Sequence, residues 1–292
     1  MSLLISVLEQ GFIYAILALG VYITYKILDF PDLTVDSSFP LGAAVSAALI
    51  VKGVNPYLTL PAAFAAGALA GLATGLIHVK CHIRDLLSGI ITMTVLYSVN
   101  LHIAGGVANV PIFSNDNIFS VFPLADRLGK YNTVFVVFFI ALVSKLLLDA
   151  YLKTKSGYLL RAVGDNTTVV TSLAKDSGTV KIIGLVISNA LVSLAGCVMC
   201  QQQRFFDISM GTGTIVIGLA SVIIGTNLFR KVTFLKATTA AVIGSLIYKA
   251  CVAFAISRGL PPIDMKLITG VLFLVILILG QLRLEKGGKA KK

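Results

Sequence analysis

The stretch TKSGYLLRAVGDNTTVVTSLAKDSGTVK, from Thr154 to Lys181, is a polar island between two long apolar blocks. On both sides of it the chain is a series of apolar runs of about 20 residues, the length with which a helix crosses a bilayer core. The island contains glycines, hydroxyl side chains and charges of both signs, so we place it outside the membrane. We therefore predict an all-α polytopic membrane protein whose two halves are joined through this island.

The composition also indicates a membrane protein. Of the 292 residues, 57% are hydrophobic and 13% are charged, and the mean hydropathy of +0.93 is well above that of soluble domains. A formal net charge of +11 would suggest a nucleic-acid partner for a soluble protein. Here the Lys and Arg residues lie mostly in short connectors, where orientation in the membrane explains them, so we expect no nucleic-acid binding.

Seven apolar runs are long enough to cross the membrane, and two more are short and bounded by polar turns. The first run lacks a basic segment before it, so we interpret it as a retained span rather than a cleaved signal. About nine membrane segments are therefore expected. The long runs are Leu3 to Ile27, Tyr57 to Val79, Leu86 to Ala104, Thr133 to Leu152, Ile182 to Cys200, Leu235 to Ile256 and Leu267 to Leu284, and the short ones are Leu41 to Val51 and Gly213 to Gly225.

The basic residues predict the orientation. If the polar island is cytosolic, most of the 24 Lys and Arg residues fall on the cytosolic side, including those of the C-terminal tail. Cytosolic connectors carry an excess of Lys and Arg in membrane proteins. We therefore expect the N-terminus outside and the C-terminus in the cytosol.

The two halves of the chain resemble each other. Phe30-Pro-Asp32 precedes the first short run as Phe205-Phe-Asp207 precedes the second. An odd number of crossings separates the matching first spans, so the second half must be inverted, as in many transporters. We predict a single transmembrane domain over residues 1–292, divided into a first half 3–104, a connecting span 131–153, the island region 154–181, a second half 182–284 and a basic tail 285–292.

The two short runs fall at corresponding places in the halves, which points to a central route through the protein. We expect non-helical backbone over Asp29 to Pro40 and Arg204 to Thr214. Such backbone survives at membrane depth where protein or water satisfies its polar groups. The alternative is that these stretches are ordinary loops at the membrane surface.

Polar side chains in these stretches and inside spans are candidates for lining the route, because lipid offers them no partner. The alternative for them is packing between helices, where Ser, Thr and Asn often form hydrogen bonds. The candidates are Asp32, Asp36, Thr94, Tyr97, Ser98, Asn100, Asn189, Asp207, Thr212, Thr214 and Ser221. Lys249, midway along its span, also needs a partner that the sequence does not name.

We find no catalytic or metal-binding set in the sequence. The four cysteines, Cys81, Cys197, Cys200 and Cys251, lie in or beside apolar runs, and we interpret them as small buried apolar residues. A P-loop pattern is absent as well. We expect a chain that is not an enzyme and binds no cofactor of its own.

Within the island, Gly164-Asp165-Asn166 has the chemistry of a helix start, and Gly178 is placed to end that helix. Apolar residues follow the start at helical spacing, so we predict a short amphipathic helix on the membrane surface. It is either a docking surface for a cytosolic partner or a connector that lies on the lipid.

Three motifs resemble permease subunits of ABC importers of the branched-chain amino acid and ribose type. They are the stretches from Ser156 to Asn166, from Ala174 to Gly178 and from Gly211 to Gly225. Two further stretches, Ile23 to Asp36 and Thr92 to Leu101, are similar to the subgroup labelled tryptophan/tyrosine-type permeases. The resemblance extends over nearly the whole chain.

The resemblance implies the type II importer fold, without the first of the ten spans of its best-known members. It implies a prokaryotic cell membrane, a second copy or a related permease, an external binding protein and a cytosolic ATPase that uses ATP and Mg. The cargo would be a small solute, with aromatic amino acids among the candidates. The island would be the coupling helix in the ATPase groove, through Arg161, Gly164, Asp165, Asn166, Val170, Leu173, Lys175 and Gly178.

An ion-coupled secondary transporter is the alternative, because these proteins also use inverted repeats and broken helices. Such a protein needs carboxylates inside the membrane to bind its ion. The predicted spans contain two, Glu9 and Asp149, and both lie near the ends of their spans.

Overall fold

The computed structural model describes residues 2–165, 176–229, 232, 235–258, 267–271, 273–275 and 278. Within these residues, seven helices are long and apolar enough to cross a membrane, and one shorter apolar helix spans Val35–Val51. The protein is thus mostly helical, as predicted. The last predicted span, Leu267 to Leu284, is described only in part.

The first half contains four helices, and α1 continues directly into a short π-helix, η1. The start of α3 follows from its sequence, because Asn55 caps it by accepting a hydrogen bond from the Tyr57 N–H, and Pro56 suits the first helical position. The elements are α1 (Ser2–Val21), η1 (Tyr22–Ile27), α2 (Val35–Val51), α3 (Pro56–Val79) and α4 (Asp85–Ile103).

The second half is built around the long helix α9. Helices α6 and α7 precede it, after the short elements β1, α5 and η2. The connecting elements are β1 (Asn109–Pro111), α5 (Ala125–Leu128), η2 (Gly129–Tyr131), α6 (Asn132–Tyr151) and α7 (Lys155–Asp165). The second half contains α9 (Ser177–Gln203), β2 (Phe205–Asp207), η3 (Ile208–Gly211), α10 (Thr214–Leu228) and α11 (Ala237–Ser257).

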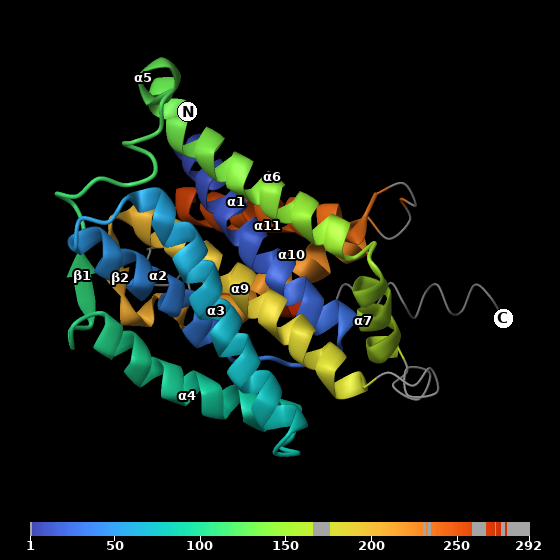
Figure 1. Ribbon diagram of the computed structural model, residues 1–292. Coiled ribbons are helices and arrows are strands. Elements are labelled where there is room, and N and C mark those ends of the chain that lie inside the picture. The colour runs from blue at the N-terminus through green and yellow to red at the C-terminus, as the bar shows by residue number, and fades with distance from the viewer. Residues whose placement is uncertain are drawn as a thin grey trace.

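Strands β1 and β2 form a small antiparallel pair, with Val110 opposite Phe206. Strands of three residues leave no alternating pattern, so the sequence did not predict them. The pair lies at one end of the helix bundle and α7 at the other (Figure 1). It ties the segment after α4 to the end of α9.

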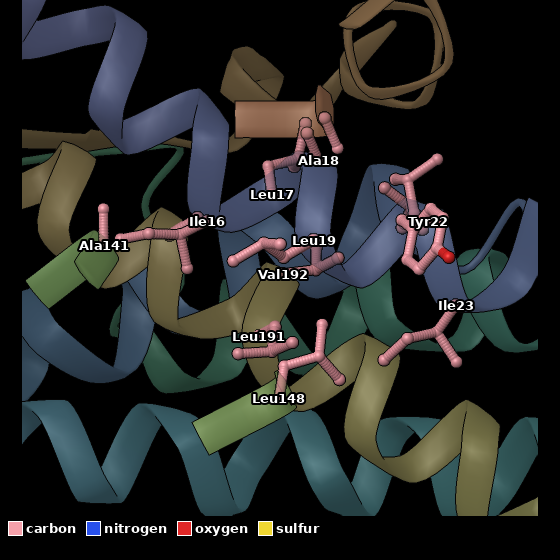
Figure 2. Packing of buried hydrophobic residues seen from close by; sticks show 14 of the residues in the cluster. Ile16, Leu17, Ala18, Leu19, Tyr22, Ile23, Ala141, Leu148, Leu191 and Val192 are labelled. Atoms are coloured by element: carbon pink, nitrogen blue, oxygen red, sulfur yellow. The ribbon is translucent and has the colours of Figure 1, made fainter. Parts of the chain in front are cut away.

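Helices α1 and α9 form the centre of the bundle. Their apolar side chains are buried on most sides, as in a helix that lies inside a protein. Figure 2 shows Leu19 of α1 beside Val192 of α9. Ile16 of α1 lies next to Ala141 of α6, and Leu191 of α9 next to Leu148 of α6. Helices α3, α6, α10 and α11 pack on this pair, and α4 packs on α2 and α3.

Helix α3 approaches α9 through a face of small residues. A Cβ atom added at Gly67 or Gly71 would collide with the carbonyl oxygens of Asn189 and Leu185 on α9. Small residues let membrane helices approach until their backbones touch, which gives dense packing where water supplies no driving force. This face fixes the position of α3 on α9.

The outer helices of each half pack on the central helix of the other half. Helix α3 packs on α9, and α11 packs on α1. A serine joins each pair: the Ser193 hydroxyl donates to the Ala63 carbonyl at 2.7 Å, and the Ser245 hydroxyl donates to the Gly11 carbonyl at 3.0 Å. The halves are therefore interleaved rather than side by side.

The two predicted interruptions have different outcomes. The predicted non-helical stretch from Asp29 to Pro40 was too long, because α2 already begins at Val35, where the N–H groups of Ser37 and Ser38 bond to the Thr34 carbonyl. The second stretch, from Arg204 to Thr214, is confirmed as a break in the α-helices, filled by β2 and η3.

Candidate functional site

Helix α7 is the described part of the polar island, and it lies across the ends of η1 and α9. Its apolar face is buried, with Leu160 and Val163 in the core, while Tyr158 and Arg161 are exposed. An amphipathic helix so placed is anchored to the bundle on one side and free to meet a partner on the other.

Gly164 and Asp165 form the last residues of α7, a helix that we did not predict from the sequence. The amphipathic helix predicted to start at Gly164-Asp165-Asn166 falls mainly on residues outside the described part of the chain, so it stays a prediction. The apolar spacing of Leu159, Leu160 and Val163 was the signal for the earlier helix. Four predicted coupling residues, Asn166, Val170, Leu173 and Lys175, lie outside the described residues, and so does the Asp165 side chain.

Gly178 begins a helix rather than ending one, which corrects the second prediction for the island. It lies in the first turn of α9, where the Asp176 carboxylate accepts hydrogen bonds from the N–H groups of Gly178 at 3.0 Å and Thr179 at 3.2 Å. Together with the Thr179 hydroxyl, these donors hold the pKa of Asp176 below its ordinary value of 3.8. The side-chain cap, not the glycine, sets this boundary.

Gly164 joins α7 to the end of the first span. A Cβ atom added at Gly164 would collide with the Ile27 carbonyl oxygen of η1. Leu160 of α7 and Leu28, directly after η1, both lie against Gly184 of α9. Helix α7 is therefore in direct contact with η1 and, through Leu160, with α9.

That chain contains the first break, and Asp32 holds it to α9. The Asn189 side-chain N–H donates to the Asp32 carboxylate at 2.7 Å, and the Ser38 hydroxyl donates to the Asn189 side-chain oxygen at 2.7 Å. The Thr34 N–H donates to the second Asp32 oxygen at 3.0 Å. All these groups are buried, so the network supplies the Asp32 carboxylate, the Asn189 amide and the Thr34 N–H with partners that lipid would not offer.

Asp36, at the start of α2, caps α10 of the other half. Its carboxylate accepts hydrogen bonds from the N–H groups of Gly213 at 3.0 Å and Ile215 at 2.9 Å, and from the Thr214 hydroxyl at 3.1 Å. A carboxylate at a helix N-terminus is stabilised by these donors and by the helix dipole. The two broken segments therefore meet at one point.

Helix α4 divides its polar residues between two faces. Asn100 is buried and its side-chain N–H donates to the Ser37 carbonyl at 3.0 Å, whereas Thr94, Tyr97 and Ser98 are exposed. Tyr97 retains 51% of its exposure. A polar row on the open face of a spanning helix is costly in lipid.

The remaining pathway candidates are also split between surface and interior. Thr212 is exposed beside the second break, and Asp207 is half-buried in the β1–β2 pair, where it accepts from the Asn109 side chain at 3.2 Å. Thr214 and Ser221 are buried, and Ser221 bonds to the Ile217 carbonyl of its own helix at 2.8 Å. The bonds of the buried candidates are those expected from helix packing; the role of every candidate in transport stays a prediction.

The charges inside the bundle have partners that the sequence did not reveal. The Lys249 ammonium lies 3.9 Å from the centre of the Tyr14 ring and 3.3 Å from the Gln10 side-chain oxygen. Asp149 contacts two lysines, Lys145 and Lys236, each at 3.0 Å. Asp149, one of the two carboxylates in the predicted spans, is thus paired with lysines of the same chain.

The cysteines are only partly as expected. Cys197 and Cys200 are buried as predicted, but Cys81 and Cys251 are exposed, because one lies in the α3–α4 connector and the other on the open side of α11. No cluster of three or more metal-binding side chains occurs in the described residues.

These features, a multi-span bundle with two breaks held together at its centre and an amphipathic helix across one end, agree with the family comparison. The family described as "Branched-chain amino acid transport system / permease component" matches residues 3–279. The chain belongs to this family. It is a permease component of an ABC transport system and a multi-pass protein of the prokaryotic cell membrane.

The relatives of this permease include transporters for different solutes. It is 44% identical to the tyrosine transport system permease protein of Clostridioides difficile, over 98% of this chain and 94% of the relative. It is 34% identical to an uncharacterized protein, RP368, of Rickettsia prowazekii, over 95% and 97% of the two chains. The ribose import permease protein RbsC of Escherichia coli K12 is 26% identical, over 76% and 68%. No solved structure matches this permease.

Proposed function

We propose that two copies of this chain form the pathway of an ATP-driven importer, with two cytosolic ATPases and an external binding protein as partners. The observation that supports the proposal is the position of α7: it packs on η1 and α9, it exposes Tyr158 and Arg161, and its Gly164 lies against the Ile27 carbonyl, just before the first break. ATP and Mg are used by the ATPase, and this chain performs no catalysis.

The coupling surface is the exposed side of α7 and the segment after it. Arg161, Gly164 and Asp165 belong to α7, and Asn166, Val170, Leu173, Lys175 and Gly178 complete the proposed set. The ATPase pushes on this surface, and Gly164 passes the push to the Ile27 carbonyl. Transport and ATP hydrolysis are coupled through this contact.

The orientation has the N-terminus outside, the C-terminus in the cytosol and about nine membrane segments. The inverted repeat relates residues 3–104 to residues 182–284. It is supported by the equivalent packing of the two halves: α3 packs on α9 of the other half, and α11 packs on α1 of the other half. This orientation puts α7 in the cytosol and the β1–β2 pair outside, at opposite ends of the bundle.

The exposed polar row of α4 faces the second copy and the route between the copies. Thr94, Tyr97, Ser98 and Thr212 are open on this chain, and Asp36 is half-buried beside the second break. In a homodimer these side chains meet protein or water instead of lipid, which removes the cost of exposing them.

We infer that the cargo is a small zwitterion, with an aromatic amino acid as the first candidate. The relative with 44% identity is named for tyrosine transport. The open candidates Thr94, Tyr97, Ser98 and Thr212 are neutral, which suits a solute without net charge.

The test is reconstitution. The permease and its ATPase are placed in lipid nanodiscs, and ATP hydrolysis is measured with the binding protein, empty or loaded with tyrosine, tryptophan or leucine. We expect faster hydrolysis with a loaded binding protein. Hydrolysis that no loaded binding protein accelerates would contradict the importer assignment, whereas acceleration by leucine alone would correct only the cargo.

A further inference from the structure

A basic cavity lies between the α3–α4 connector and the first turn of α9. It has a volume of about 390 Å³ and opens to the surface. Its polar wall consists of His78, His82, Arg84, Ser177, Gly178 and Lys181. None of these positions except Gly178 belongs to the proposed coupling surface, so the cavity needs an explanation of its own.

The charged side chains that line this cavity are positive. Arg84 and Lys181 line it, and Lys80 lies on the same connector. Within the described part of the chain, these three side chains form no ion pair; both ion pairs there involve Asp149. Of the carboxylates on the neighbouring elements, Asp176 caps α9 and interacts electrostatically with Lys80, and Asp85 accepts from the Leu86 N–H at 2.9 Å. Arg84 and Lys181 therefore supply the positive charge of the cavity itself.

The wall of the cavity is held in place by His78. The Nδ1 atom of His78 lies 2.8 Å from the Ile83 carbonyl oxygen, and because a carbonyl can only accept, Nδ1 must carry the hydrogen. The His78 ring also meets the Phe30 ring edge to face, with 5.1 Å between their centres. The connector is therefore fixed in shape before any ligand binds.

Apolar surface continues from the cavity along two spanning helices. On α3, Leu72 and Leu76 are exposed, and on α4, Leu86 and Leu87 are exposed, all within about two helical turns of the connector. A ligand that matches both parts has an anionic head and apolar tails. A free phosphate ion would fill the cavity and leave this apolar surface unused.

We propose that the cavity binds the headgroup of an anionic phospholipid of the cytosolic leaflet, with its acyl chains on the exposed faces of α3 and α4. Basic cavities between spanning helices on the cytosolic side are suited to such headgroups. The inference rests on the orientation given under the proposed function. The bound headgroup neutralises Arg84 and Lys181 and stabilises the first turn of α9, which contains Gly178 of the proposed coupling surface.

The experiment measures binding of phosphatidylglycerol and of phosphatidylcholine to the purified permease in detergent, by native mass spectrometry. The variant is the double substitution Arg84→Gln and Lys181→Gln, and the matched control is Arg127→Gln with Lys130→Gln on the other side of the membrane. Each basic side chain near an anionic lipid contributes about fivefold in affinity. We expect the wild type and the control to prefer phosphatidylglycerol and the double variant to lose about 25-fold of that preference.

Equal binding of the two lipids to the wild type, or an unchanged preference in the double variant, would overturn the proposal. Glycerol 3-phosphate tests the source of the phosphate: if it displaces phosphatidylglycerol at equal concentration, the site is one for a soluble phosphate and the lipid is wrong. If the double variant does not fold, the two single variants decide, with about fivefold expected for each. The readout is binding, so failure of transport in the reconstitution leaves this result intact.

Discussion

At the scale of single residues, Asp36 shows how one side chain joins the halves. Replacement of Asp36 by Ala removes an acceptor shared by three donors at the start of α10. We expect a loss of about 1–2 kcal/mol in the free energy of unfolding, because that is the usual value of a helix cap. Asp36→Asn retains an acceptor and is expected to lose less.

Thermal unfolding of the purified protein in detergent measures this effect. Asp116→Ala is the matched control, since Asp116 is an exposed carboxylate far along the chain from any break. An Asp36→Ala protein as stable as the wild type would contradict the cap. Equal losses for Ala and Asn would show that the charge, and not the acceptor, holds α10.

Gly164 gives a second prediction at this scale. In Gly164→Leu the added side chain must displace the Ile27 carbonyl, so η1 and α7 can no longer touch as they do. We expect loss of substrate-stimulated ATP hydrolysis with normal insertion into the membrane. Gly270→Ala is the control, because a Cβ atom there meets nothing within 4 Å. Wild-type stimulation in Gly164→Leu would remove Gly164 from the coupling path.

At the scale of elements, the start of α9 depends on the ionised Asp176. The pKa of Asp176 is lowered in the folded protein by the Thr179 hydroxyl and the first N–H groups of the helix. The stabilisation is therefore present above the ordinary pKa of 3.8 and is lost as the pH falls through the lower folded value. Asp176→Ala should remove it at every pH.

Hydrogen exchange of the amides of Gly178 and Thr179 is the measurement. We expect faster exchange in Asp176→Ala than in the wild type at pH 7, and an intermediate rate in Asp176→Asn, because Asn also caps helices. Identical exchange in all three proteins would mean that another group protects this turn.

The elements also show what the sequence could and could not predict. The long spans were predicted correctly because an uninterrupted run of about 20 apolar residues matches the thickness of the bilayer core. The start of α2 was missed, since Ser37, Ser38 and Pro40 are residues typical of a loop. In the structure the Thr34 carbonyl accepts the N–H groups of Ser37 and Ser38, which begins the helix. The start of α9 was missed for the opposite reason. Gly178 suggested the end of a helix, but the Asp176 side chain, two residues earlier, caps the start of one.

The candidate site was predicted by residue type but not by partner. Asp32, Asn100 and Asn189 were recognised as unusual in a membrane, yet each bonds to a residue distant in sequence, such as Ser37 or Ser38. Such pairs are created by the packing of helices and have no local pattern. The same holds for Lys249, whose neighbours Tyr14 and Gln10 come from the other end of the chain.

At the scale of the whole molecule, Cys81 reports the orientation. It is exposed in the α3–α4 connector, and a variant with the other three cysteines replaced by Ser carries it alone. We expect no reaction with a membrane-impermeant maleimide in intact cells and full reaction in inside-out vesicles. Labelling in intact cells would reverse the orientation and, with it, the cytosolic assignment of α7.

The interleaving of the halves has a consequence for how the protein is made. Helix α3 reaches its final partner, α9, only after more than a hundred further residues have been added, and α1 must wait even longer for α11. Until then the glycine face of α3 and the Asp36 carboxylate have nothing to pack against. The nascent first half therefore lacks its packing partners until the second half has been translated. We expect it to be sensitive to quality-control proteases during this time, and more so when translation is slow.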